Sequence, residues 1–284
     1  MTTDPTPTAV YGVDLSAAAK SAGASTWVAR CVPDGDTLVV ETLASASEFL
    51  GLDSTARADV LPALADHLAT VEGPAVAGLD FPFSLPAWTL GGDDWRAFVE
   101  ATPEEWGALA GVDDPRDLYE AVRAGADEGR PIRRATDDEH GGQDPAGFRI
   151  KTQTYYGISV LLSRLIARDG VCVPPVLSVP DPRLTVLETY PASVFDRLDD
   201  AARTGYKKAQ RRHVEARRRN VEALRAAGVR FGRDDAARTL VDCAVATDDA
   251  LDAVAAAYAA HRNYPDALDR EYDAEERREA RIFA

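Results

Sequence analysis

Residues 9–15 read AVYGVDL and residues 75–86 read AVAGLDFPFSLP, and these two apolar stretches decide the fold. Each is a short run rich in alanine and valine, which is typical of a buried strand. The first run reaches an acid at Asp14 and the second at Asp80. Ligands bind at the carboxyl ends of parallel strands in an α/β sheet, so both acids are candidate ligand-binding residues.

Three further segments have the pattern of strands. Residues 25–32 and 36–43 alternate on either side of Pro33-Asp34-Gly35, which predicts a hairpin turn. Residues 183–191 form a fifth apolar run and contain another acid, Glu188. Together the five runs predict a mixed five-stranded sheet.

The remaining sequence is dominated by helical spacing. Helices are expected at 54–71, where Pro62 should kink or delay the helix, and at 207–228, and a third should end at Gly170. Residues 133–147 are polar and read as a loop. We therefore predict an α/β fold whose sheet is flanked by helices. We expect a single domain over 1–284 that contains a helical and loop insertion at about 88–180.

The composition narrows the classes of function. The chain has 47 acidic and 32 basic residues and a net charge of −15, and only four of the basic residues are lysines. Such a surface is typical of halophilic proteins, because molar salt screens the self-repulsion. A generic nucleic-acid binder would instead carry a basic excess. Phosphate-binding glycine loops and a nucleophile elbow are absent from the sequence.

The sequence also indicates where in the cell the protein is found. No apolar run approaches the ~18–20 residues that a membrane span needs, and residues 1–8 lack the features of a signal peptide. Cys31, Cys172 and Cys243 are isolated, so they form neither a disulfide framework nor a metal-binding pair. We expect a cytoplasmic protein with no membrane association.

The acids at the strand ends indicate a cation site. A carboxylate inside an apolar run is costly unless it pairs, binds a cation or is satisfied by backbone N–H groups. Asp14, Asp80 and Glu188 share this setting, and a divalent metal would neutralise their mutual repulsion. Asp249 and Asp252 are three residues apart and share a helix face, and the alanines after them would let that helix approach the sheet.

Five segments together resemble one family. They are GVDLS (12–16), GLDFPFSLP (78–86), ETYPASVF (188–195), the YKK…R segment (206–219) and DDALDAVAAAYAA (248–260). In this order they are similar to DUF429, a family of predicted nucleases with a ribonuclease-H-like fold. That wider superfamily places acids on the first strand, the fourth strand and the final helix. The resemblance therefore implies a ribonuclease-H-like sheet for this chain.

The resemblance also implies a catalytic site. Asp14, Asp80, Asp249 and Asp252 would hold two Mg²⁺ or Mn²⁺ ions bridged by Asp14, and Asp252 or Glu188 would complete a coordination shell. One ion would activate water for attack on phosphorus and the other would stabilise the leaving oxygen. The implied activity is metal-dependent hydrolysis of phosphodiester bonds in DNA or RNA.

Basic residues supply candidate contacts to the substrate phosphates. One group is Lys207, Lys208 and Arg211 on the expected basic helix. The alternative interpretation of this group is a solvated helix face whose charges pair with nearby glutamates. A second group, Arg134, Arg149 and Lys151, resembles the arginine-containing insertion of the same family.

Two other functions stay open. One is a non-catalytic binding module that has kept the fold, and the other is an enzyme that acts on a small phosphorylated substrate. An insertion that closes over the site would favour the small substrate, whereas an open basic groove would favour a polymer. The sequence identifies no protein partner.

Overall fold

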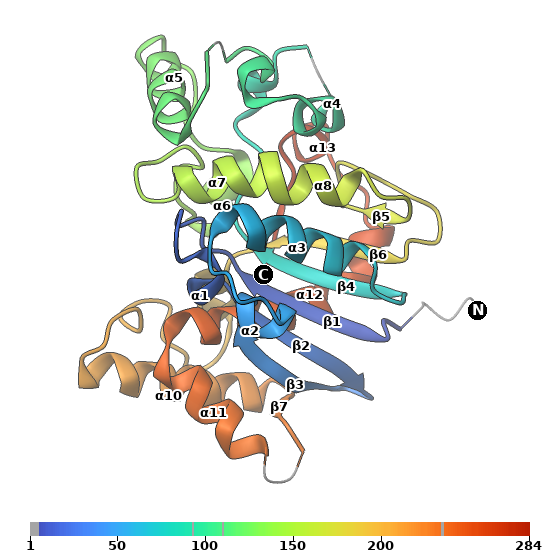
Figure 1. The fold of residues 1–284 in the computed structure, drawn as a ribbon, viewed down its shortest axis with the longest axis vertical. Helices are drawn as coiled ribbons and strands as arrows, with labels where there is room; N and C mark the ends of the chain where they lie inside the picture. The colour runs from blue at the N-terminus through green and yellow to red at the C-terminus, as the bar shows by residue number, and fades with distance from the viewer. Residues whose placement is uncertain (1–5, 93, 110, 234–235) are drawn as a thin grey trace.

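The computed structural model describes residues 6–92, 94–109, 111–233 and 236–284 (Figure 1). Residues 1–5 of the polar N-terminal segment, and residues 93 and 110 of the expected insertion, lie outside this range. The centre of the fold is a sheet with the order β5-β6-β4-β1-β2-β3-β7, and β8 pairs with β6. The strands are β1 (Ala9–Asp14), β2 (Trp27–Asp34), β3 (Thr37–Ser45), β4 (Ala75–Asp80), β5 (Val171–Cys172), β6 (Leu184–Thr189), β7 (Val229–Phe231) and β8 (Ile282–Phe283).

The five predicted strands correspond to β1, β2, β3, β4 and β6. β1, β2 and β3 form an antiparallel meander, and the remaining strand pairs in the described residues are parallel. The hairpin turn between β2 and β3 contains Gly35 with a φ of +61°. The predicted count of five is too low, because the sheet of the described residues has eight strands. The additional strands β5, β7 and β8 have two or three residues each, which is too short to show a periodicity.

Helices cover both faces of the sheet (Figure 1). On one face lies α3 (Arg57–Ala69), which runs through Pro62 and does not begin there. Beside it runs a continuous helical segment made of α7 (Lys151–Tyr156), a π-helical part (Gly157–Leu162) and α8 (Ser163–Ile166). The opposite face is covered mainly by α12 (Asp248–Asp269).

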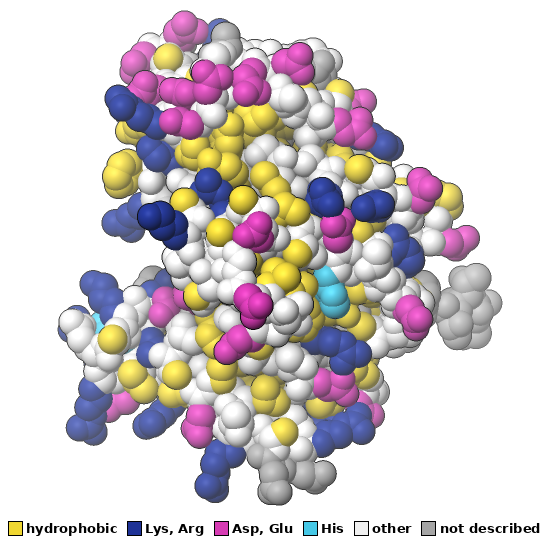
Figure 2. Space-filling view, in the orientation of Figure 1, with side chains coloured by type: hydrophobic (Ala, Val, Ile, Leu, Met, Phe, Trp, Pro, Cys, Tyr) yellow, Lys and Arg dark blue, Asp and Glu magenta, His cyan; other side chains and the backbone are white. Residues whose placement is uncertain are grey.

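The other helices are shorter or more peripheral. They are α1 (Ala22–Ser25), α2 (Ala46–Leu50), α4 (Trp95–Glu100), α5 (Pro115–Asp127), α6 (Ala135–His140), α9 (Pro191–Arg197), α10 (Arg211–Ala226), α11 (Ala236–Ala246) and α13 (Glu276–Glu279), with single 3₁₀ turns at Ala87–Leu90 and Pro103–Glu105. Figure 2 shows acidic side chains gathered over α4 and α5, and Lys and Arg side chains near α10 and α11. Among the described residues, no helix is both long and apolar enough to cross a membrane.

The basic helix starts later than predicted. It was expected from residue 207, but α10 begins at Arg211, and Tyr206 and Lys207 lie outside it. Tyr206 is buried, and the Arg217 guanidinium donates hydrogen bonds to the carbonyl oxygens of Tyr206 (2.5 Å) and Lys208 (2.9 Å). These tertiary contacts override the local helix propensity. A further difference concerns residues 133–147, expected to be a loop, which contain the short helix α6.

Two glycines bring α12 into direct contact with the sheet. A Cβ atom on Gly12 of β1 would lie 2.0 Å from the Ala253 carbonyl oxygen, and one on Gly78 of β4 would lie 2.2 Å from the Ala256 carbonyl oxygen. The helix therefore rests on strand backbone, and its alanines are small enough to permit this approach. The close packing that the alanine run predicted is confirmed, and it brings the start of α12 to the ends of β1 and β4.

We expect Gly12→Ala and Gly78→Ala each to lower the free energy of unfolding by about 3 kcal/mol or more. The added methyl group would have to push helix backbone away from the sheet, and overpacking of this kind is relieved only by backbone shifts. Urea denaturation at constant KCl concentration measures the effect. Gly92→Ala is the matched control, because a Cβ there meets no atom within 4 Å. Equal stability of Gly12→Ala and Gly92→Ala would contradict the packing described.

Candidate metal centre

Three aspartates converge where β1, β4 and α12 meet. Asp14 and Asp80 end neighbouring parallel strands and are paired in register. They share a sheet face with Gly12 and Gly78, which is the face that α12 covers. Asp252 lies on α12, and one carboxylate oxygen from each of the three aspartates lies within 4.8 Å of the others.

Asp252 is the most buried member of the group, with 1% of its surface exposed. The Tyr206 hydroxyl donates a hydrogen bond to its Oδ1 at 3.0 Å, and the Lys207 ammonium lies 2.6 Å from its Oδ2. Both partners come from the segment just before α10. Because α10 begins only at Arg211, Lys207 lies with Tyr206 at the acid cluster and not on the predicted helix.

Burial and mutual repulsion raise the pKa values of these carboxylates. Burial, followed by Asp80 and Asp252, raises the pKa of Asp14 well above its usual value. Burial raises the pKa of Asp80 to about 7, and Asp252 adds to this while Lys207 opposes it. Burial tends to lower the pKa of Lys207, but Asp252, Asp80 and Asp14 outweigh it and raise that pKa, so the ammonium stays charged. When its three carboxylates are deprotonated, the cluster holds more negative charge than one lysine neutralises.

The donor set of the cluster fits a hard divalent cation. Its three ligands are carboxylate oxygens, the atoms that Mg²⁺ and Mn²⁺ prefer. The unfavourable repulsion among them is the interaction that a bound cation would relieve. Asp14, Asp80 and Asp252 could therefore hold such an ion, as the sequence predicted for these three residues.

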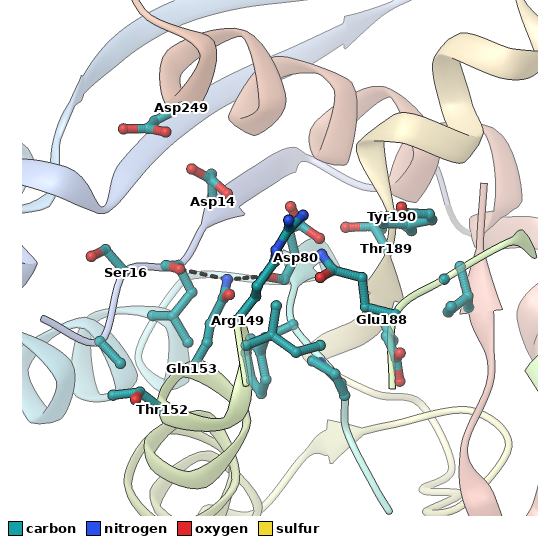
Figure 3. A pocket seen from close by; sticks show the side chains of 18 of the residues that line it. Asp14, Ser16, Asp80, Arg149, Thr152, Gln153, Glu188, Thr189, Tyr190 and Asp249 are labelled. Atoms are coloured by element: carbon teal, nitrogen blue, oxygen red, sulfur yellow. Dashed lines mark hydrogen bonds between the residues drawn. The ribbon is translucent and has the colours of Figure 1, made fainter. Parts of the chain in front are cut away.

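Asp249 lies beside the cluster without belonging to the group of three. It lies one turn before Asp252 on α12 and lines the same cavity, where Figure 3 shows its carboxylate on the α12 side of Asp14. Burial, with Asp248 and Asp252, raises its pKa to about 6. Its predicted role as a metal ligand stays a prediction.

Glu188 is separated from the acid cluster. In the register of the sheet it pairs with Leu79, the residue before Asp80, so its side chain points to the opposite face. There it is buried and binds Arg134 through two contacts of 2.5 and 2.8 Å, and it accepts a hydrogen bond from the Phe83 backbone. Figure 3 shows its carboxylate turned away from Asp14 and Asp80. The structure does not bring Glu188 together with the other predicted catalytic acids.

A cavity of about 590 Å³ is lined by Asp14 and Asp80 of the cluster. Segments far apart in the sequence line it, including the ends of β1 and β4, the start of α12 and residues 142–153. Arg149 and Lys207 supply its accessible positive charge, and Figure 3 shows Arg149 extending toward Asp80. Arg134 also borders the cavity, but it is fully buried and its guanidinium binds Asp137 and Glu188.

The remaining predicted phosphate contacts lie away from the cavity lining. The Lys151 ammonium lies 5.0 Å from the ring centres of Tyr119 and Phe148. Lys208 is exposed, and Arg211 forms an ion pair with Glu215 on the surface of α10. The structure thus brings Arg149 and Lys207 to the acids and leaves these other three cations outside.

Gln153 is a residue at this site that the sequence did not indicate. Its side-chain amide donates hydrogen bonds to the carbonyl oxygens of Leu15 (2.6 Å) and Asp80 (2.9 Å), as the dashed lines in Figure 3 show. It therefore holds the ends of β1 and β4 together and fixes the spacing of their aspartates. Polar residues are common on amphipathic helices, so no sequence feature distinguished Gln153 as a site residue.

The fold and the cluster define a mixed α/β protein with a carboxylate site at the ends of its parallel strands. The model of a family described as "Protein of unknown function (DUF429)" matches residues 12–277, so the chain belongs to the DUF429 family. No curated protein and no solved structure matches it.

Asp80→Asn should become more stable relative to the wild type as the pH rises from about 4 to about 7. Over this window the folded wild type retains a proton on Asp80 that the unfolded chain has released, so the wild type loses stability with rising pH. Asparagine has no such proton to lose. Melting temperatures of both proteins without divalent metal, at fixed KCl concentration, measure the difference. A difference that is constant from pH 4 to 8 would contradict the repulsive environment of Asp80.

Proposed function

We propose that this protein is a divalent-metal-dependent hydrolase that cleaves phosphodiester bonds in nucleic acid. The observation that carries the proposal is the convergence of Asp14, Asp80 and Asp252, whose carboxylate oxygens lie within 4.8 Å of one another. Mg²⁺ or Mn²⁺ is the proposed cofactor. Such a cation, when bound, stabilises negative charge on phosphate oxygens and lowers the pKa of water.

The topology supports a ribonuclease-H-like assignment. The long strands have the order β6-β4-β1-β2-β3, with an antiparallel meander followed by parallel strands. The acids stand on the first strand, on the fourth strand and on α12, which are the positions that the resemblance implied. We further propose that the chain is a single domain in which residues 88–180 are an insertion.

The aspartates have distinct positions in the proposed site. Asp14 is on β1, which pairs with β4 and contacts α12. It therefore lies between the elements that carry Asp80 and Asp252, and it is the proposed shared ligand. Asp80 would hold a cation from the β4 side, and Asp252 would hold one from the α12 side. Asp249 would complete the shell on the α12 side. Glu188 has a structural role in this proposal, because Arg134 already neutralises it.

Arg149 and Lys207 are the proposed contacts to the substrate phosphate. Both line the same cavity as Asp14 and Asp80 and come from different segments of the chain. An exposed guanidinium such as that of Arg149 can bind two phosphate oxygens at once. Gln153 would act indirectly, by holding the strand ends that carry Asp14 and Asp80.

The dimensions of the cavity favour a second candidate, an enzyme that acts on a small phosphorylated compound. A volume of about 590 Å³ is within the range of about 300–1,000 Å³ that is usual for small-molecule sites. Six residues between 142 and 153 contribute to its wall. The proposed metal chemistry would be the same, and only the substrate would differ.

Asp14→Asn should reduce Mn²⁺-dependent cleavage by a factor of about 1,000 or more, because it removes the shared ligand of the proposed site. The substrates are labelled single-stranded, duplex, hybrid and branched nucleic acids and a panel of phosphorylated nucleosides, each in a KCl series. Asp36→Asn in the exposed β2–β3 turn is the control. Cleavage of only the nucleosides would favour the second candidate. Full activity of a folded Asp14→Asn protein would exclude the proposed site.

Arg149→Ala should weaken binding of a single-stranded oligonucleotide and reduce the slope of log affinity against log salt concentration by about 0.7. The reason is that each cation contacting a phosphate releases counterions on binding. Lys151→Ala is the matched control, because Lys151 lies two residues away but outside the cavity lining. Fluorescence anisotropy in a KCl series, with Ca²⁺ in place of Mn²⁺, measures both quantities. Equal slopes for the two variants would count against Arg149 as a phosphate contact.

A further inference from the structure

The segment before α10 is held at the acid cluster, and one of its side chains is more than half exposed. Tyr206 is buried and donates its hydroxyl hydrogen bond to Asp252. Arg217 fixes the backbone on both sides of Lys207, through the carbonyl oxygens of Tyr206 and Lys208. The Lys207 side chain, in contrast, is 54% exposed. Its ammonium can therefore leave Asp252 without any movement of the backbone.

Lys207 occupies the less encumbered oxygen of Asp252. Oδ1 accepts the Tyr206 hydrogen bond, so Oδ2 is the oxygen more open to a metal. Oδ2 forms an ion pair with Lys207 at 2.6 Å and accepts no further hydrogen bond from the described residues. An ammonium group and a divalent cation compete for that oxygen, because like charges at such short range repel strongly.

We propose that Lys207 is an exchangeable counter-ion of the metal centre. It neutralises Asp252 in the metal-free protein, and a divalent cation that binds the cluster displaces its ammonium into the cavity. There the ammonium would face an anionic substrate. The inference rests on the metal site of the proposed function, and it assigns to Lys207 a role in cation binding that a plain phosphate contact would not have.

Charge supports the exchange. The three carboxylates and the one ammonium leave the deprotonated cluster with a net charge of two negative units, since three negative groups face one positive group. A divalent cation neutralises two of the three carboxylates, and an ammonium that stays within the cavity still balances the third. A cation bound to Asp252 replaces the ammonium as the direct partner of that carboxylate, and its repulsion opposes the ion pair.

The test is the Mn²⁺ affinity of metal-free wild type, Lys207→Met and Lys208→Met, measured by calorimetry at one pH and one KCl concentration. Methionine keeps the length of the side chain and removes the competing charge. We expect Lys207→Met to bind Mn²⁺ about tenfold more tightly than the wild type, and Lys208→Met to match the wild type. Lys207→Met should also melt at a lower temperature without metal, and saturating Mn²⁺ should close that gap.

A second measurement uses the wild type and does not depend on the variant folding. Acetylation of the lysines is followed by mass spectrometry with and without Mn²⁺. We expect Mn²⁺ to raise the labelling rate of Lys207 severalfold relative to that of Lys208, because the ion pair with Asp252 is broken. Asp14→Asn, which lacks a metal ligand, should show no such change.

The outcomes separate the two proposals. Mn²⁺ binding by the wild type that is as tight as, or tighter than, binding by Lys207→Met would overturn the exchange and leave the metal site standing. Unchanged labelling of Lys207 at saturating Mn²⁺ would do the same. Absence of Mn²⁺ binding in both proteins would overturn the metal site and the exchange together.

Discussion

The contact between α12 and the bare backbone of β1 and β4 is the constraint on which the site depends. Gly12 and Gly78 remove the side chains that would normally separate a helix from a sheet, and the alanines of α12 fill the narrow gap. This close approach places Asp252 beside Asp14 and Asp80 instead of a full side-chain layer above them. The same packing that buries the core thus forces three carboxylates together, and the energetic cost of that repulsion is what a cation would relieve.

Successive side chains of a strand point to opposite faces of the sheet, and this places two groups of charged residues on opposite sides. On the α12 side are the aspartates, which have one lysine for three carboxylates. On the other side Glu188 and Asp137 share the buried Arg134, whose guanidinium also donates to the Glu279 carbonyl oxygen. The second group is satisfied within the protein and ties residues near the C-terminus to β6. The second has two carboxylates for one guanidinium, and both carboxylates are hydrogen-bonded to Arg134. The first has three carboxylates for one ammonium, and this larger excess of negative charge distinguishes the candidate site from the internal support.

Much of this arrangement could be predicted from the sequence, because it depends on local pattern. The acids at the ends of apolar runs, the alanine-rich helix and the five long strands each have a short-range signal. Glu188 shows the limit: its position at a strand end looked equivalent to that of Asp80, but its face depends on a register between distant strands. Lys207 and Gln153 show another limit. The basic segment marked Lys207 as a phosphate contact, but its place beside Asp252 depends on tertiary contacts that delay the start of α10. Gln153 bridges two strand ends and has no local pattern.

The distance along the chain between the parts of the acid cluster has a consequence for how the molecule is made. β1 and β4 leave the ribosome long before α12 (Asp248–Asp269), which packs against both strands. Until α12 is synthesised, Gly12 and Gly78 lie on an uncovered apolar face, and Asp14 and Asp80 have neither Asp252 nor Lys207 beside them. Contacts of such long range slow folding. This face of the sheet, which later carries the site, is therefore covered late during synthesis. Until then the nascent chain must be protected from aggregation there.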